Sequence, residues 1–185
     1  MARHHDNARE RVLDAFEDLL NANGDSAVTL EGVALRAELT KGGLLYHFRS
    51  RAALVAALVD RFESRTRDDL EEMAHADEGA AASYLRVLDY LSSPLHRTTL
   101  AMGQLASREP AAADALARSR EAELEVLTAD VGDPVISRLT MVLAEGLLFQ
   151  ASTRPAASQD NAPVVEWFKT HVLAAYAATD RSTRD

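Results

Sequence analysis

Basic side chains gather in one short stretch of an otherwise acidic chain. Between positions 36 and 51 a single carboxylate, Glu38, stands against four cations, Arg36, Lys41, Arg49 and Arg51. Cations in such a cluster could neutralise the phosphates of a nucleic acid. Residues with small or polar side chains lie among them and would let a helix approach base edges in the major groove: Thr40, Gly42 and Gly43. This stretch therefore predicts binding chemistry and not catalysis.

The net charge is unevenly distributed along the chain. The 185 residues together carry a net charge of −9, and negative charge is repelled by phosphate. Residues 1–65 are nearly balanced, with 9 Lys and Arg against 10 Asp and Glu, whereas residues 66–185 hold 11 against 19. The acidic C-terminal part would turn away from DNA and leave only the N-terminal end able to approach it. A hydrophobic content of 47% is typical of a globular protein and excludes intrinsic disorder.

The elements that must position this stretch are predicted to be helices. Apolar residues recur at helical spacing, and strand alternation is nearly absent. An apolar stripe in the first twenty residues ends at the stop signal Asn23-Gly24. Thr29 is predicted to cap a short second helix, Thr40 a third over about 40–47, and Ser50 a long fourth helix. Short helices joined by a tight turn are the layout of a helix-turn-helix.

Proline predicts where the later helices begin. Helices frequently open with proline because its fixed φ suits the first turn and its missing N–H group is not needed there. Four prolines stand at such positions, namely Pro94, Pro110, Pro134 and Pro163. The expected fold class is all-α, with about nine helices.

The run over positions 40–54, TKGGLLYHFRSRAAL, resembles the signature of the TetR family of repressors. That signature reads roughly S/T-K-G-x-L-Y-Y-H-F-x-S/N-K-x-x-L and lies about forty residues from the N-terminus. The resemblance covers about residues 8–60, and the remainder is similar to the family only in helical character and length. It implies a helix-turn-helix DNA-binding domain over 1–50, a three-helix head. It also implies a helical C-terminal domain for effector binding and dimerisation over 51–185.

The resemblance also implies which residues contact DNA. Thr29 and His47 would bind phosphate, and Tyr46 would pack or bond to the DNA backbone. Arg51 takes the place of a family lysine and keeps its positive charge. Its planar guanidinium can donate two parallel hydrogen bonds and therefore suits phosphate better than an ammonium group. Arg49 would add a further phosphate contact. The full predicted set is Thr29, Thr40, Lys41, Gly42, Gly43, Tyr46, His47, Arg49 and Arg51.

Three positions depart from the family pattern. Glu38 stands where the family usually has a turn glycine, and a left-handed backbone there would cost roughly 1 kcal/mol. Leu45 replaces the first of two tyrosines, so its contact with the DNA backbone is expected to be lost. Gly43 offers no base-reading side chain but lets the backbone approach closely. The operator sequence therefore cannot be read from the third helix.

Family members dimerise through their last two long helices, which here would span about 134–152 and 163–178. A two-fold operator also requires a dimer, because each half-site needs its own reader about one DNA turn from the other. The alternative is that the apolar stripes of these helices face the chain's own core. The predicted interface residues are Ile136, Leu139, Leu143, Gly146, Leu147, Val165, Phe168 and Val172.

The function implied is that of a ligand-responsive transcriptional repressor and not of an enzyme. It would bind a palindromic DNA operator as a homodimer and be released by a small-molecule effector, whose binding residues the sequence does not identify. No cofactor or metal is expected, and the absence of cysteine excludes disulfides and thiolate zinc sites. No signal peptide and no apolar run of membrane length are found, so we expect a cytoplasmic protein without a membrane partner.

Two other functions remain open on the sequence alone. A TetR-fold adaptor or antirepressor could keep the fold without binding DNA. A helical-bundle metal enzyme could use the run Glu72-x-x-His75, whose spacing occurs in carboxylate-bridged di-iron bundles. Such bundles need a second run of this kind, which the sequence lacks, and acidic residues surround the first one. We therefore interpret Glu72 and His75 as part of a solvated helix face.

Overall fold

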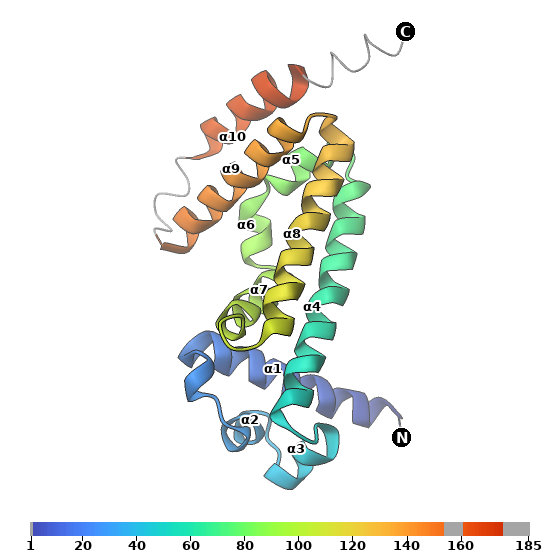
Figure 1. Cartoon of the computed structure of the whole chain (residues 1–185), viewed down its shortest axis with the longest axis vertical. Coiled ribbons are helices and arrows are strands. Elements are labelled where there is room, and N and C mark those ends of the chain that lie inside the picture. Colours follow the sequence, from blue (N-terminus) through green and yellow to red (C-terminus); the bar gives the residue numbers. More distant parts are fainter. Residues whose placement is uncertain (1, 154–160, 176–185) are drawn as a thin grey trace. The chain divides into compact units, whose positions relative to one another are not determined.

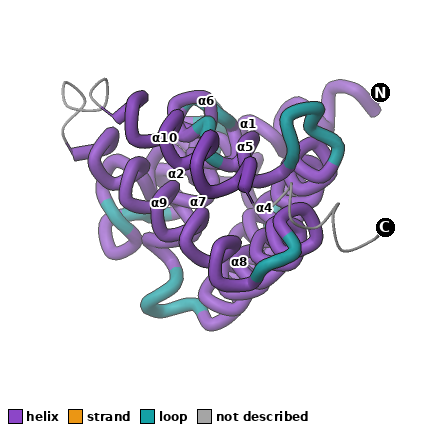
Figure 2. The backbone as a smooth tube through the Cα atoms, turned by 90° about the horizontal axis from the view of Figure 1, so that it is seen from above, coloured by secondary structure: helices purple, strands orange, loops and turns teal. Residues whose placement is uncertain are grey.

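The computed structural model describes residues 2–153 and 161–175, and all its regular structure is helical (Figures 1 and 2). The expected all-α class is confirmed. The described residues form ten α-helices where about nine were expected, because the stretch from 80 to 91 contains two short ones. None of the described helices is long and apolar enough to cross a membrane. The elements are α1 (Ala2–Asn23), η1 (a 3-10 turn, Asp25–Ala27), α2 (Leu30–Arg36), α3 (Lys41–His47), α4 (Arg51–Ala74), α5 (Ala80–Tyr84), α6 (Val87–Leu91), α7 (Pro94–Leu105), α8 (Pro110–Val131), α9 (Pro134–Thr153), α10 (Ala162–Phe168) and η3 (a π turn, Lys169–Leu173).

The predicted helix boundaries are confirmed where local chemistry sets them. The side chains of Thr29, Thr40 and Ser50 accept hydrogen bonds from backbone N–H groups three residues later, at 3.1, 3.0 and 3.1 Å. Each bond satisfies an amide that the first helical turn leaves without a partner. Proline opens three of the later helices as expected, at Pro94, Pro110 and Pro134.

The described chain divides into two compact units. The first comprises the chain up to Thr66 together with Pro94–Arg118, and the second comprises Arg67–Ser93 and the chain from Ser119 onward. The helices α4 and α8 therefore contribute residues to both units. The functional division at position 50 stays a prediction, because the units describe compactness and not activity.

The core of the first unit is built on the apolar stripe of α1. Val12, Phe16 and Leu20 are fully buried, and α1 packs against α2 and α7. The helix ends at the predicted stop signal, where Gly24 has a φ of 71° that favours glycine over any other residue. A chain reversal at this point allows α2 to return against α1.

The core of the second unit is formed by α5, α8 and α9 with the last described helical turns. One buried cluster contains Leu85, Ala144 and Leu147, and a second contains Ala81, Leu127 and Met141. In Figure 1 the helices α9 and α10 lie side by side and run in opposite directions. This arrangement agrees with the packing of Val165 and Phe168 against the first cluster.

A partly buried group of acids lies in the second unit. The hydroxyl of Tyr84 donates to Glu123 at 2.8 Å, and the hydroxyl of Ser119 donates to the other oxygen of Glu123 at 3.0 Å. Burial raises the pKa of both Tyr84 and Glu123. On α4, burial and then the charges of Glu123 and Glu72 raise the pKa of Asp69 to about 6. Asp69 therefore changes charge close to neutral pH.

The elevated pKa of Asp69 predicts that its contribution to stability depends on pH. The folded pKa lies above the ordinary 3.8, so the protonated carboxyl stabilises the fold. This contribution is complete below about pH 3.8 and is lost as the pH rises through about 6. We expect Asp69→Asn to lose less stability than the wild type between pH 4 and pH 7 in urea denaturation. The control Asp68→Asn, at the neighbouring exposed carboxylate, should follow the wild type. Equal pH dependence in wild type and Asp69→Asn would contradict the prediction.

Candidate nucleic-acid interface

The helices α2 and α3 pack on each other through small and apolar side chains. Ala34 and Ala37 are buried where the helices approach each other, as expected of a helix-turn-helix, and Leu44 and Phe48 anchor α3 in the core. Leu44 is fully buried, so α3 cannot rotate about its axis without exposing it. The orientation of the exposed side of α3 is therefore fixed.

The turn between these two helices contains the only non-glycine residue with a positive φ among the described residues. Glu38 has a φ of 58°. Its N–H group donates to the Leu35 carbonyl at 3.1 Å, and the N–H group of Leu39 donates to the Ala34 carbonyl at 2.8 Å. These two bonds form a Schellman motif, in which glycine usually takes the left-handed position. The left-handed backbone considered for Glu38 from the sequence is confirmed.

Replacing Glu38 with glycine is expected to raise the stability of the protein slightly. A left-handed conformation costs a residue with a Cβ atom about 1–2 kcal/mol. Glycine removes this cost but loses roughly 0.4–1 kcal/mol through the greater freedom of its unfolded chain. A net gain of up to about 1 kcal/mol should shift the midpoint of thermal unfolding upward. Glu38→Ala keeps the Cβ atom and should bring no comparable gain, and an equal gain from both variants would exclude backbone strain as the cause.

The outward side of α3 carries small and polar residues. Thr40, Lys41 and Gly42 are exposed, and Gly43 is half-buried. A Cβ atom added at Gly42 would meet only the Thr40 hydroxyl, at 3.9 Å, and one added at Gly43 would come within 3.4 Å of the same oxygen. Neither glycine has a positive φ. The space outside Gly42 is therefore open to an external surface such as a duplex, whereas Gly43 is partly covered by Thr40 and Leu39.

The aromatic and histidine residues of α3 lie at its C-terminal end. Tyr46 is 73% exposed, an unusual position for so large an aromatic side chain. His47 is half-buried, and its ring meets that of Tyr46 edge-on with centroids 5.4 Å apart. Leu45 is also half-buried. Tyr46 and His47 are therefore brought together, with the tyrosine on the outside.

Three of the four cations between positions 36 and 51 have carboxylate partners within the chain. Lys41 pairs with Glu31 at 2.6 Å, and its hydrogen bond holds the pKa of Glu31 below the ordinary value. Arg51 pairs with Asp25 and approaches the Val28 carbonyl at 3.5 Å. Arg36, also in the basic stretch, pairs with Asp18 at 2.7 Å. The basic stretch is therefore largely neutralised within the chain, which the local charge count could not reveal. Arg49, two residues beyond the end of α3, is exposed.

The residues predicted for the dimer interface do not share one exposed surface. Ile136 and Leu147 are each only 8% exposed. Three further residues of the set, Leu143, Val165 and Phe168, pack against the cluster that contains Leu147. Ile136 and Leu147 therefore face the chain's own core, whereas Leu143, Val165 and Phe168 are only partly buried and their place in an interface stays a prediction. Leu139 and Gly146 are exposed, and Val172 is partly buried.

A different apolar stripe of α9 and α10 is open to solvent. On α9 it includes Phe149, which is 69% exposed, and on α10 it includes Trp167, which is 58% exposed. The α9 members follow one another at intervals of four, three, four and three residues, so they lie on one helical face. We call this surface the outer stripe, and it consists of Val135, Leu139, Val142, Gly146, Phe149, Val164 and Trp167.

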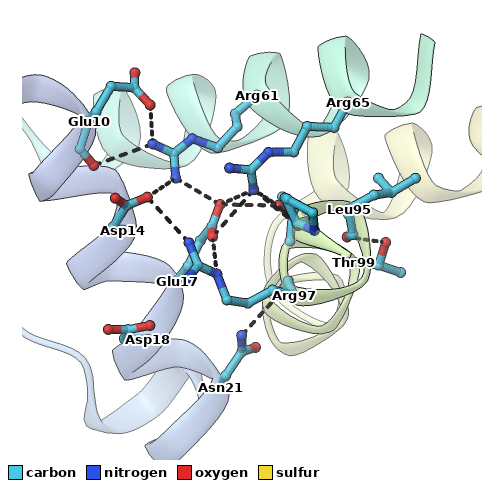
Figure 3. A network of polar contacts seen from close by, with 12 residues as sticks. Glu10, Asp14, Glu17, Asp18, Asn21, Arg61, Arg65, Leu95, Arg97 and Thr99 are labelled. Carbon is cyan, nitrogen blue, oxygen red and sulfur yellow. Dashed lines mark hydrogen bonds and ion pairs between the residues drawn. The ribbon is translucent and has the colours of Figure 1, made fainter. Parts of the chain in front are cut away.

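A network of ion pairs around Glu17 joins three helices of the first unit (Figure 3). Glu17 on α1 is fully buried. Its carboxylate accepts from Arg61 of α4 at 3.0 Å, from Arg65 of α4 at 3.1 Å and from Arg97 of α7 at 3.1 Å. Thr98 donates to the same carboxylate at 3.1 Å. The single acid therefore holds α1, which carries the packing surface for α2, to α4 and α7.

The sequence of the first helix contains a weak signal for this network. Glu17 stands next to Phe16 in the middle of the apolar stripe of α1, where a charge is unexpected. Arg61 and Arg65 are four residues apart and share one face of α4. Burial alone lowers the pKa of Arg61, but the hydrogen bond and charge of Glu17 raise it above its ordinary value.

The run Glu72-x-x-His75 lies at the other end of α4, where both side chains are exposed as expected.

Comparison with known sequences supports the N-terminal assignment. Residues 12–58 match the family model described as bacterial regulatory proteins, tetR family. Over 63 residues the chain is 32% identical to an uncharacterized HTH-type transcriptional regulator in the dhlA 5' region of Xanthobacter autotrophicus. That match covers 34% of this chain and 31% of the relative, so it spans about a third of the relative's length.

Comparison with solved structures extends the similarity of fold to most of the chain. A protein from Rhodococcus sp. described as a TetR-family transcriptional regulator matches with a TM-score of 0.65 at 20% identity, over 85% of this chain and 94% of that one. The structure of SmeT in complex with triclosan matches with a TM-score of 0.61 at 22% identity, over 88% and 90% of the two chains. At these identities the likeness establishes the fold.

Proposed function

The chain belongs to the TetR family of bacterial regulatory proteins, and from this premise we propose that it is a transcriptional repressor which binds an operator as a homodimer. The observation that carries the proposal is the outward side of α3. Thr40, Lys41 and Gly42 are exposed there together with Tyr46, while Leu44 holds the helix in the core. A short, rigidly held helix with small and polar outer residues fits the major groove. We propose positions 1–50 as the DNA-binding part and 51–185 as the part for dimerisation and effector binding.

The residues around α3 would divide the work of DNA binding. Thr29 uses its oxygen to cap α2, and its hydroxyl hydrogen remains able to donate to a phosphate. Arg49 and Lys41 supply charge, and Arg51 and His47 would bind phosphate on the flank of α3. The glycines Gly42 and Gly43 allow close approach of the α3 backbone. These contacts position the protein, whereas base reading is left to few side chains.

The dimer would form through the outer stripe. Contiguous exposed apolar surfaces on soluble proteins frequently mark interfaces, and the outer stripe runs along α9 and α10, which lie side by side (Figure 1). A second copy of this chain is the occupant that the operator geometry requires, because two recognition helices must reach successive half-sites. Gly146 in the middle of the stripe would allow the partner helix to approach closely.

Release by a small molecule completes the proposal. SmeT, whose fold this chain shares, has been solved with triclosan bound. An effector that binds one of two conformations more tightly shifts the protein toward that conformation. If that conformation binds DNA less well, effector binding lowers the affinity for DNA. A thermal-shift screen of apolar small molecules should find compounds that raise Tm by mass action, and the same compounds should weaken DNA binding.

The direct test of DNA binding is a mobility-shift assay with the duplex immediately upstream of the protein's own coding sequence. We expect a retained complex whose log K falls linearly with log salt, with a slope set by the number of phosphate contacts. A duplex of unrelated sequence should bind more weakly. Failure to retain any duplex in dilute buffer would remove the repressor assignment.

A second function is favoured by the internal pairing of Lys41, Arg51 and Arg36. With their charges neutralised by acids of the same chain, these residues are less available to phosphate. An adaptor or antirepressor with this fold would show the same pairing and no retained duplex, so the mobility-shift assay separates the two functions.

Neutralising Glu31 is expected to strengthen DNA binding. Glu31→Gln removes the carboxylate that pairs with Lys41 and a negative charge from the proposed interface. Affinity should rise roughly three- to tenfold for any duplex, because a like charge no longer faces the phosphates. Stability should fall slightly, because an acid is lost from the first turn of α2.

The matched control for Glu31→Gln is Glu63→Gln. It removes the same charge from a surface ion pair with Arg118, away from α3. If both variants gain equally, overall charge and not the release of Lys41 is the cause.

A further inference from the structure

The side chain of Asp25 holds two arginines that come from different parts of the first unit. One carboxylate oxygen pairs with Arg51, at the start of α4. The other lies 3.5 Å from Nη1 of Arg108, in the turn before α8. Asp25 is 11% exposed, Arg51 34% and Arg108 63%. We call these three residues the Asp25 corner.

The surroundings of the Asp25 corner hold Arg51 in a defined position. Its guanidinium also reaches the Val28 carbonyl at 3.5 Å and lies over the Phe16 ring, 5.7 Å from the ring centroid. Val28 directly precedes the residue that caps α2, so Arg51 ties the beginning of α4 to the beginning of α2. The turn that carries Arg108 is itself fixed, because the Arg108 N–H group donates to the Leu105 carbonyl at 2.9 Å.

The charges of the Asp25 corner do not balance, since two cations share one carboxylate. If Arg51 turned toward a DNA phosphate, a lone Asp25 would become a nearly buried carboxylate close to a polyanion, which is strongly unfavourable. Arg108 already touches the second oxygen, and its exposure leaves it room to move closer. If Arg108 took over as the partner of Asp25, moving Arg51 to a phosphate would therefore cost less free energy than leaving Asp25 unpaired.

We propose that Arg108 is a positioning residue for DNA binding, which neutralises Asp25 while Arg51 binds a phosphate and does not itself touch the DNA. The proposal rests on the proposed function, because it needs a duplex as the competing anion. It places a determinant of DNA affinity almost sixty residues beyond the helix-turn-helix. It also links the proposed phosphate contact to the turn that leads into α8.

The test is a double-mutant cycle of Arg108→Ala and Asp25→Asn, measured with one short duplex over a range of salt concentrations. In the wild-type background Arg108→Ala should lower affinity about tenfold, within the range of coupling between contacting charges, and leave the salt slope unchanged. In the Asp25→Asn background it should have no effect, because no carboxylate remains to be neutralised. Arg108→Lys should restore most of the affinity. Arg118→Ala, at an exposed arginine of α8 paired with Glu63, should behave as the wild type.

Several outcomes would overturn the proposal. A salt slope shallower by about one unit in both backgrounds would show that Arg108 binds phosphate directly. Unchanged affinity in both backgrounds, with or without a lower Tm, would show that the contact is only structural. A wild-type protein that retains no duplex would overturn the proposed function together with this inference. A wild type that binds DNA beside an Arg108→Ala variant with full affinity would overturn the inference alone.

Discussion

Glu17→Ala is expected to destabilise the folded protein by about 3–5 kcal/mol, the usual cost of removing one partner from a buried ion pair. Arg61 is only 8% exposed and would lose its one fully buried acid, keeping only the partly exposed Glu10 and Asp14 as partners. Arg65 would lose the same partner. The loss should be measured as the change in the free energy of unfolding in urea. Glu17→Gln keeps the shape of the side chain and removes only its charge. It should also destabilise the protein strongly, because the arginines lose the negative charge that they share.

The matched control is Asp18→Ala, at the next position of the same helix. Asp18 pairs with Arg36 at the surface, and surface pairs contribute about 0–1 kcal/mol. If Glu17→Ala and Asp18→Ala cost the same, Glu17 does not organise the first unit.

If the proposed homodimer forms through the outer stripe, Phe149→Glu is expected to convert it into a monomer and to lower affinity for the proposed operator by at least about 100-fold. A charge in the middle of the outer stripe would have to be buried without a partner in the dimer. Two linked half-site contacts exceed one by roughly 10²–10⁴ in affinity, and the monomer loses this advantage. Phe149 is 69% exposed, so the folded monomer should tolerate the change. Sedimentation and a mobility-shift assay would measure both effects.

Leu100→Glu serves as the control for Phe149→Glu. Leu100 on α7 is also an exposed apolar residue, 49% accessible, but it lies outside the outer stripe. A Phe149→Glu variant that still sediments as a dimer would place the interface elsewhere. Loss of the dimer in both variants would indicate a general effect of added charge.

The features that the sequence predicted correctly depend on residues close together in the chain. The caps at Thr29 and Thr40 each involve an amide three residues away. The left-handed turn at Glu38 is closed by hydrogen bonds within five residues. Such chemistry is visible in a short window, and the family signature lies within the same window. The prediction that the outer side of α3 faces DNA followed from this signature.

The features that the sequence did not reveal depend on distant partners. Glu17 meets Arg61 and Arg97 at separations of 44 and 80 residues, and Arg51 meets Asp25 across 26. Only tertiary packing decides which charges meet. Of the outer stripe, only Leu139 and Gly146 were among the interface residues predicted from the sequence, for a related reason. α9 has apolar residues on more than one face, and periodicity alone does not tell which face meets the chain's own core.

The pairing of Arg36 and Lys41 with acids of the same chain has a consequence for how the proposed regulator would search a genome. A chromosome offers on the order of 10⁶–10⁹ decoy sites, and their hold on a regulator grows with its sequence-independent affinity. Cations already satisfied within the chain add little to that hold. We therefore expect brief visits to decoys, and a small number of copies per cell should suffice to keep an operator occupied.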